Sequence, residues 1–149
     1  MTDDPRPLYE RCSDTEHRFE TDVDIWVASA STSGAPYLVP LSFEWNGQTI
    51  LVATPAGSQT ARNLASTRTA RLGLGVTRDV TMIEGSVEML GMDEVAVERA
   101  DRFAARTGFD PRELADPYKW FLVTPLRIQA WREANELRGR ELMRDGRWL

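Results

Sequence analysis

The chain has 149 residues, 42% hydrophobic and 28% charged, a composition typical of one soluble globular domain with a core of its own. Its net charge of −5 and pI near 5.0 argue against binding nucleic acid through phosphate contacts. A single cysteine excludes an internal disulfide, and a single histidine leaves no Cys/His cluster, so we expect no metal site.

The N-terminal segment, residues 1–22, is polar and contains two early prolines. We expect a loose arm with a short helix there, followed by one domain over residues 23–149. The acidic start does not match a signal peptide, and no apolar run approaches the ~18 residues of a membrane span. The sequence therefore predicts a cytoplasmic protein that contacts no membrane.

The central part of the chain has the patterns of β-strands. Residues 24–31 are apolar on both alternating faces, and residues 37–45 carry one heavy apolar face. The turn signals "TSGAP" and "NG" indicate hairpins on either side of the second segment. A break is expected near Pro125, because proline cannot donate to a strand ladder. The segments expected as strands are residues 24–31, 37–45, 48–54, 70–76, 80–90 and 118–132, the last as one or two strands.

Helical signals are fewer. A short helix is expected over residues 59–65, and a longer one over residues 92–108, capped by Asp93 and ended by Gly108. The sequence "DPRE" over residues 110–113 predicts another short helix, since it places a cap, a proline and a glutamate at the usual spacing. The tail mixes helix formers with a "DG" turn.

Sequential antiparallel strands in so short a chain must close on themselves or pack as two sheets to protect their edges. We therefore expect a mainly β (α+β) fold, a six- to seven-stranded antiparallel barrel with a few short flanking helices.

The stretch "ATPAGSQTARNLAS" carries the strongest binding signal. Ser58 is a plausible N-cap, and the first amides of the following helix offer hydrogen bonds and partial positive charge to a phosphate. Thr54, Gln59 and Thr60 add hydroxyl and amide groups, and Arg62 adds a guanidinium one turn from Ser58. In the simpler alternative, Ser58 only caps the helix, Arg62 is solvated and Asn63 bonds to a loop.

The strand expected over residues 70–76 has two different faces. Ala70, Leu72, Leu74 and Val76 form a core face. The opposite face carries Arg71 and two glycines, Gly73 and Gly75, which indicate either a bend of the barrel or room for a flat ligand against the backbone. Arg71 lies on this face and can reach the same phosphate.

In order, these segments resemble the pyridoxamine 5′-phosphate oxidase-like superfamily of flavin- and deazaflavin-binding split β-barrels, over roughly residues 20–132. The resemblance rests on "DIWVASAS", "PYLVPLSFEW", a strand ending in Thr54, "GSQTARNLAST" and "RTARLGL". In that family a T-x-x-x-S-x-K pattern and a following N-L hold the cofactor phosphate. Thr54, Ser58 and Asn63 match that pattern, whereas Thr60 stands where the family usually has lysine. Arg62 or Arg71 would then have to supply the missing charge.

The resemblance also implies a ring site and an assembly. The flavin ring would lie along the second strand, contacted largely by backbone at Val39, Pro40, Leu41 and Ser42. The family typically forms homodimers with a cofactor in each intersubunit cleft. Late residues of the partner subunit would cover the ring, and by position these include the two residues Trp120 and Trp131, for which core packing is the alternative.

No Ser-His-Asp set and no persuasive carboxylate pair is present, so we assign no catalytic side chain. A chain of this kind can still be a redox enzyme, because the cofactor supplies the chemistry. The resemblance thus implies hydride transfer between FMN, or the alternative 8-hydroxy-5-deazaflavin coenzyme, and a small organic substrate. The tail has no histidine, so oxidation of pyridoxamine phosphate itself is not expected. A non-catalytic binder of a flavin or another flat ligand, and a structural dimer with a decayed site, remain the alternatives.

Overall fold

The computed structural model describes residues 4–149, and within them the fold is mainly β. The strands are β1 (Asp24–Ala30), β2 (Pro36–Trp45), β3 (Ile50–Pro55), β4 (Thr69–Val76), β5 (Asp79–Leu90), β6 (Tyr118–Trp131), β7 (Glu141–Arg144) and β8 (Arg147–Trp148). The helices are α1 (Leu8–Thr21), α2 (Gln59–Thr67) and α3 (Val97–Thr107), with 3₁₀ turns η1 (Pro111–Glu113) and η2 (Ala134–Glu136). None of the described helices is long and apolar enough to span a membrane.

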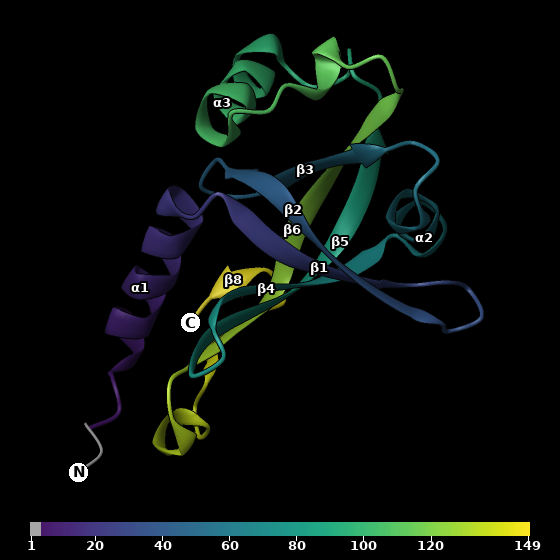
Figure 1. Ribbon diagram of the computed structural model, residues 1–149. Helices are drawn as coiled ribbons and strands as arrows, with labels where there is room; N and C mark the ends of the chain where they lie inside the picture. Colours follow the sequence, from purple (N-terminus) through teal and green to yellow (C-terminus); the bar gives the residue numbers. More distant parts are fainter. Residues whose placement is uncertain (1–3) are drawn as a thin grey trace.

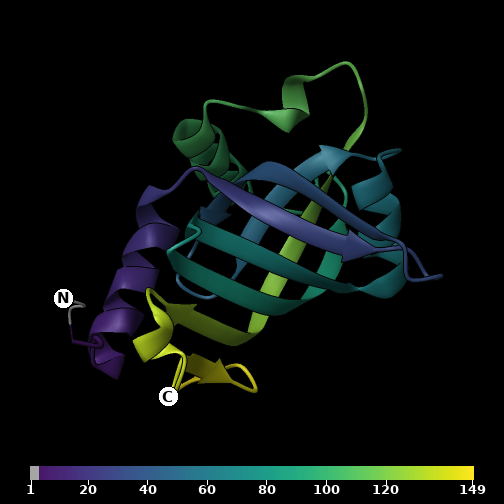
Figure 2. The ribbon, with the colours of Figure 1, turned by 60° about the horizontal axis from the view of Figure 1, so that its bottom comes forward.

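The strands form one antiparallel sheet in the order β3-β2-β1-β4-β5-β6-β7-β8, and an additional pairing of β3 with β6 closes the first six into a barrel. Figures 1 and 2 show this barrel, with β7 and β8 extending from β6 at one end. Closure removes most free strand edges, as the sequence argument required. The predicted six- to seven-stranded antiparallel barrel is therefore confirmed, with two extra short strands in the tail.

The barrel interior holds the larger core, in which alternate residues of each strand point inward. Phe43 and Val52 oppose each other across β2 and β3, and Leu72 and Ile83 across β4 and β5. Ala61 and Leu64 of α2 join this core, so the helix covers one end of the barrel. Val76, expected on the same face as Leu72, is 70% exposed, because it lies beside the β4–β5 turn.

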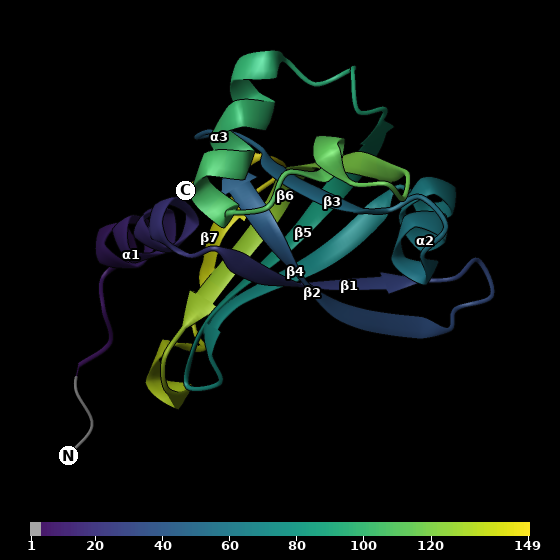
Figure 3. The same cartoon turned by 45° about the horizontal axis from the view of Figure 1, so that its top comes forward.

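A second core lies between the outer face of β3 and β6 and the helix α3, which lies beside the end of β2 in Figure 3. Gly108 ends α3 with a φ of 71°, as expected. The helix begins only at Val97, so the predicted cap at Asp93 is wrong. The reason is local: Glu94 accepts the Gly91 N–H at 2.9 Å and closes a turn before the helix.

Strand β6 is continuous, so the break expected near Pro125 is wrong. Pro125 instead lies opposite Gly85 at a register shift. At such a bulge the ladder is locally interrupted, so the strand tolerates a residue without an N–H. The "DPRE" segment forms a 3₁₀ turn capped by the Asp110 side chain, shorter than the helix expected there. The "DG" signal is the turn of the β7–β8 hairpin, with Gly146 at a φ of 76°.

Within residues 1–22, of which 1–3 lie outside the described part, α1 is a 14-residue helix and not the short helix that was expected. Phe19 is fully buried in the barrel core and stacks near Trp45, with ring centroids 4.6 Å apart. At its start, Arg6 donates its backbone N–H and its guanidinium to Glu136 of η2 at 2.7–3.0 Å. Farther along, Arg18 pairs with Asp79 at 2.7 Å. We call Arg6, Arg18, Asp79 and Glu136 the terminal clamp.

Candidate cofactor site

The barrel is split between β2 and β3. The two strands pair only from Phe43 to Trp45, against Ile50 to Val52. Before Phe43, β2 pairs with β1 alone, and after Val52, β3 pairs with β6 alone. The first half of β2 is therefore an open strand edge within an otherwise closed barrel.

The open edge presents specific backbone groups. Phe43 donates its N–H to Val23 at 2.9 Å, on the β1 side of β2. Backbone groups of successive residues in an antiparallel strand point to alternate sides. Ser42, Pro40 and Leu38 therefore direct theirs away from β1, into the split. Pro40 occupies this edge at no cost to the ladder, because its missing N–H faces no neighbouring strand.

A groove of about 360 Å³ lies beside this edge. One wall consists of Pro40, Leu41 and Ser42, and the opposite wall is aromatic, formed by Phe109 and Tyr118 with ring centroids 5.6 Å apart. Ala53, Pro55 and Asp24 complete the lining. Asp24 accepts the Ser42 hydroxyl at 2.9 Å. The groove thus combines flat apolar walls with a row of unpaired backbone groups.

The N-terminus of α2 follows directly after β3. Ser58 caps the helix by accepting the Ala61 N–H at 3.0 Å, and its hydroxyl also lies 3.0 Å from that of Thr54. Within residues 4–149, the amides of Gln59 and Thr60 have no acceptor. Two hydroxyls and two free amides therefore gather at the positive end of the helix, a donor set suited to an anion.

Polar side chains tie α2 to β1. Gln59 donates to Asn63 at 2.7 Å, and Asn63 donates to Ser29 of β1 at 3.1 Å. Arg62 donates to the Gly57 carbonyl and, at 2.8 Å, to the Gln59 side chain. Gln59, Arg62 and Asn63 thus position the helix, and Asn63 bonds to a strand where the simpler alternative expected a loop.

The two cations proposed for the missing lysine are both engaged. Arg71 forms a close ion pair with Glu84 on β5, and Arg62 makes the two contacts above. Thr60 is only 2% exposed, so the position that carries lysine in the resembling family is buried here. The donor set therefore fits a phosphate by geometry, while the predicted sources of charge are occupied.

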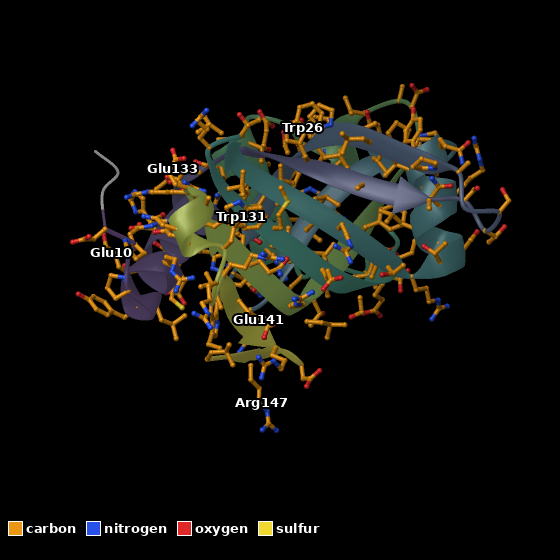
Figure 4. The ribbon with its side chains drawn as sticks, turned by 90° about the horizontal axis from the view of Figure 1, so that it is seen from below. Glu10, Trp26, Trp131, Glu133, Glu141 and Arg147 are labelled. Atoms are coloured by element: carbon orange, nitrogen blue, oxygen red, sulfur yellow. The ribbon has the colours of Figure 1, made fainter. Side chains whose placement is uncertain are left out.

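An apolar groove of about 410 Å³ crosses the outside of the barrel next to the split. Trp26, Leu38 and Met82 line it and are 51%, 60% and 41% exposed. Its floor includes Gly73, which lies between Trp26 and Met82 in the register. Trp26 also pairs with Pro40 across β1 and β2, so groove and split share one face. Figure 4 shows Trp26 on this outer surface.

The two tryptophans assigned to the ring lie in different environments. Trp120 is fully buried in the second core, edge-on to Phe103 at 5.0 Å, and therefore has no surface to offer a ligand. Of the two alternatives given for Trp120, the structure therefore shows core packing. Trp131 is half-buried at the end of β6, opposite Val80, with the Arg140 guanidinium 5.6 Å from its ring. Trp131 ends β6, whereas Tyr118 of the groove begins that strand, so within one chain Trp131 does not meet the split.

The predicted site residues form two groups. Pro40, Leu41 and Ser42 of β2 line the groove, although Val39 and Leu41 also pack against the barrel core. Thr54 and Ser58 do not line this groove and meet each other where β3 passes into α2. Sequence reasoning missed Asp24, Phe109 and Tyr118. Asp24 and Tyr118 begin strands and Phe109 lies in the loop after α3, and no local pattern indicates which strand such residues will face.

The comparisons agree with this geometry. The sequence model described as Pyridoxamine 5′-phosphate oxidase matches residues 20–132. A solved structure named F420 Reductase has a TM-score of 0.63 at 16% identity, covering 76% of this chain and 94% of its own. A pyridoxamine 5′-phosphate oxidase-related, FMN binding protein from Nostoc punctiforme has a TM-score of 0.56 at 15% identity. The match covers 87% of this chain and 86% of the Nostoc chain.

A heme binding protein from Mycobacterium smegmatis has a TM-score of 0.67 at 18% identity, covering 95% of this chain and 59% of its own. The search among curated protein sequences found no match. Identities this low establish the fold alone, whereas the family match spans most of the chain. The chain belongs to the pyridoxamine 5′-phosphate oxidase-like family.

Proposed function

We propose that this chain binds a flavin-type cofactor at the split and exchanges hydride between it and a small organic substrate. The observation that carries the proposal is the open backbone edge of β2 beside the N-terminus of α2. Such an edge offers hydrogen bonds to the polar rim of a flat ring. A bound flavin or deazaflavin would supply the hydride chemistry, so the protein needs no catalytic side chain of its own.

In this proposal the chain's own residues bind and orient. Leu38, Pro40 and Ser42 would contact the ring through their backbone groups. The hydroxyls of Thr54 and Ser58, with the Gln59 and Thr60 amides, would hold the phosphate. Phe109 and Tyr118 would form the apolar wall that excludes water from one side of the slot. Asp24 would make this end of the slot unfavourable for an anionic substrate.

FMN is the preferred cofactor and the deazaflavin coenzyme the alternative. The deazaflavin coenzyme has a long anionic tail, which favours a broad basic groove. In this chain Arg62 and Arg71 are engaged by other groups, and Asp24 adds a carboxylate to the groove. The names of the structural neighbours include both cofactor types and so do not favour either.

We further propose a homodimer in which a second copy covers the groove of Trp26, Leu38 and Met82. The support is an exposed apolar face that continues into the split through the Trp26–Pro40 pair. A partner on this face would also enclose a bound ring. Trp26→Glu should therefore convert the dimer to a monomer in sedimentation analysis and weaken FMN binding, while Val97→Glu, on exposed α3, should do neither.

The visible spectrum of the purified protein tests the function first. FMN or the deazaflavin coenzyme is then added to colourless protein, and binding is followed by fluorescence. Tight binding, reduction by a nicotinamide or chemical donor and reoxidation by a substrate support the enzyme. If neither FMN nor the deazaflavin coenzyme binds at high concentration, the proposal is wrong.

The specific alternative is a non-catalytic binder of a flavin or another flat ligand such as haem. It is favoured by the similarity to the heme binding protein from Mycobacterium smegmatis. Binding without turnover would support it. A Soret band on addition of haem, with no flavin binding, would identify haem as the ligand.

A further inference from the structure

We infer that Lys119 supplies the positive charge that holds the cofactor phosphate, in place of the lysine that the family has at the position of Thr60. The inference rests on the proposed function, because it concerns the same site. It also names the residue that the sequence could not, since Lys119 lies 59 positions after Thr60, as their numbers give (119 − 60).

The register places Lys119 at the anion-binding end of the split. Lys119 on β6 is the direct partner of Thr54 on β3. Residues paired in this way project from the same face, with Cβ atoms about 5 Å apart. The turn before α2 is held on the start of β6, because Ala56 donates its N–H to Pro117 at 2.9 Å. The backbone of Lys119 therefore lies beside that of Thr54, whose hydroxyl contacts Ser58.

Lys119 is also available for a ligand. It is half-buried, and among residues 4–149 it makes no hydrogen bond and no ion pair. By contrast, Arg62 and Arg71 are held by Gly57 and Glu84. Partial burial of a cation without a partner is unfavourable, and an incoming phosphate would relieve it. The flexible four-carbon stem of lysine lets the ammonium follow the phosphate.

Chemical labelling tests this in the unaltered protein. Lys119 is the only lysine in the chain, so an amine-acetylating reagent reports on it alone, with the chain's α-amine as the internal reference. Peptide mass spectrometry should show that saturating FMN slows acetylation of Lys119 at least about five-fold, and that saturating riboflavin, which lacks the phosphate, slows it less. Equal protection by both ligands, or none by FMN, would overturn the inference.

Variants give a second readout. Lys119→Gln should weaken FMN binding about ten- to hundred-fold, the effect of losing one charged hydrogen bond, and leave riboflavin binding within about two-fold. Lys119→Arg should keep most of the FMN affinity. Arg147→Gln is the matched control, since it removes the same charge from an exposed side chain on β8 and should change neither affinity.

The outcomes separate the two proposals. If Lys119→Gln is folded and keeps the wild-type ratio of FMN to riboflavin affinity, Lys119 does not hold the phosphate, while the flavin site stands. If the wild-type protein binds neither flavin nor deazaflavin, the proposed function fails, and the role of Lys119 fails with it.

Discussion

The terminal clamp and the split use polar groups in opposite ways. In the clamp, Glu136 is 3% exposed and accepts three hydrogen bonds from Arg6 and one from the Arg132 N–H at 2.8 Å. In the split, the first half of β2 has no neighbouring strand on one side and borders a groove, and the Gln59 and Thr60 amides at the start of α2 have no acceptor within residues 4–149. Both regions are polar, but Glu136 of the clamp is paired within the chain, whereas the first half of the β2 edge is left without a neighbouring strand.

This difference indicates which region holds the fold together and which is left for a ligand. A buried carboxylate persists only when it is fully paired, so each clamp residue depends on the others. Unpaired donors at a surface cost little, because water can satisfy them until a ligand arrives. Substitutions in the clamp should therefore act on stability, and those around the split chiefly on binding.

The largest expected effect comes from breaking the clamp. Glu136→Ala leaves the buried Arg6 guanidinium without its main partner and should lower the free energy of unfolding by about 3–5 kcal/mol. Urea denaturation measures this. Glu133→Ala is the control, because the Glu133 side chain is exposed next to η2 and pairs with exposed Arg78 at 3.5 Å. Equal losses for both variants would contradict the special role of the clamp.

The same carboxylate should give the fold an acid-sensitive component. Hydrogen bonds from Arg6 lower the pKa of Glu136 from 4.5 to about 2. Since the folded pKa is the lower one, this stabilisation is complete above pH 4.5 and is lost as the pH falls toward 2. Unfolding free energies of the wild type should decline over that window. Glu136→Gln should decline less, and parallel curves would show that other carboxylates control acid unfolding.

Two glycines of β4 allow a sharper comparison. Gly75 has a φ of +87°, and a Cβ there would lie 2.1 Å from the Asp79 carbonyl, next to the clamp. Gly75→Ala should destabilise the protein by at least about 1–3 kcal/mol. A Cβ on Gly73 would meet only ordinary contacts, the nearest being Met82 Sδ at 3.5 Å.

Gly73→Ala should therefore change stability by less than about 0.5 kcal/mol, as for a surface substitution. Because Gly73 forms the floor of the outer groove, the same variant should weaken dimerisation if a second copy packs there. Thermal unfolding and sedimentation on both glycine variants make the comparison. A large stability loss in Gly73→Ala would mean that the groove is part of the fold.

The helix cap is expected to show a modest stability effect together with an effect on binding. Ser58→Ala removes the acceptor of the Ala61 N–H and should cost about 1 kcal/mol of stability. It should weaken FMN binding by about 1–3 kcal/mol if Ser58 also holds the phosphate. Ser58→Gly is the useful control, because glycine is tolerated at a helix N-cap. This variant should lose FMN affinity with little loss of stability. Unchanged affinity in both variants would mean that the anchor is misplaced.

Local patterns predicted the elements that depend on near neighbours. The alternation in residues 37–45, the "NG" turn and Gly108 each act within a few residues, and β2, the hairpin and the end of α3 follow them. Pro125 was misleading because the effect of a proline on a strand depends on the neighbouring strand, and here Gly85 on β5 accommodates a bulge. Asp93 was misleading because a nearer turn, closed by Glu94, delays the helix.

The sequence by itself determined an antiparallel barrel and the Thr54–Ser58 motif at the N-terminus of a short helix, since strand period, turn chemistry and capping are local properties of the chain. Only the tertiary structure decided that Glu136 closes a clamp on Arg6, that Trp120 is core, and that Lys119 stands opposite Thr54. The physical reason is that barrel closure joins β3 to β6 across more than 60 intervening residues, and no pattern within either segment specifies that register.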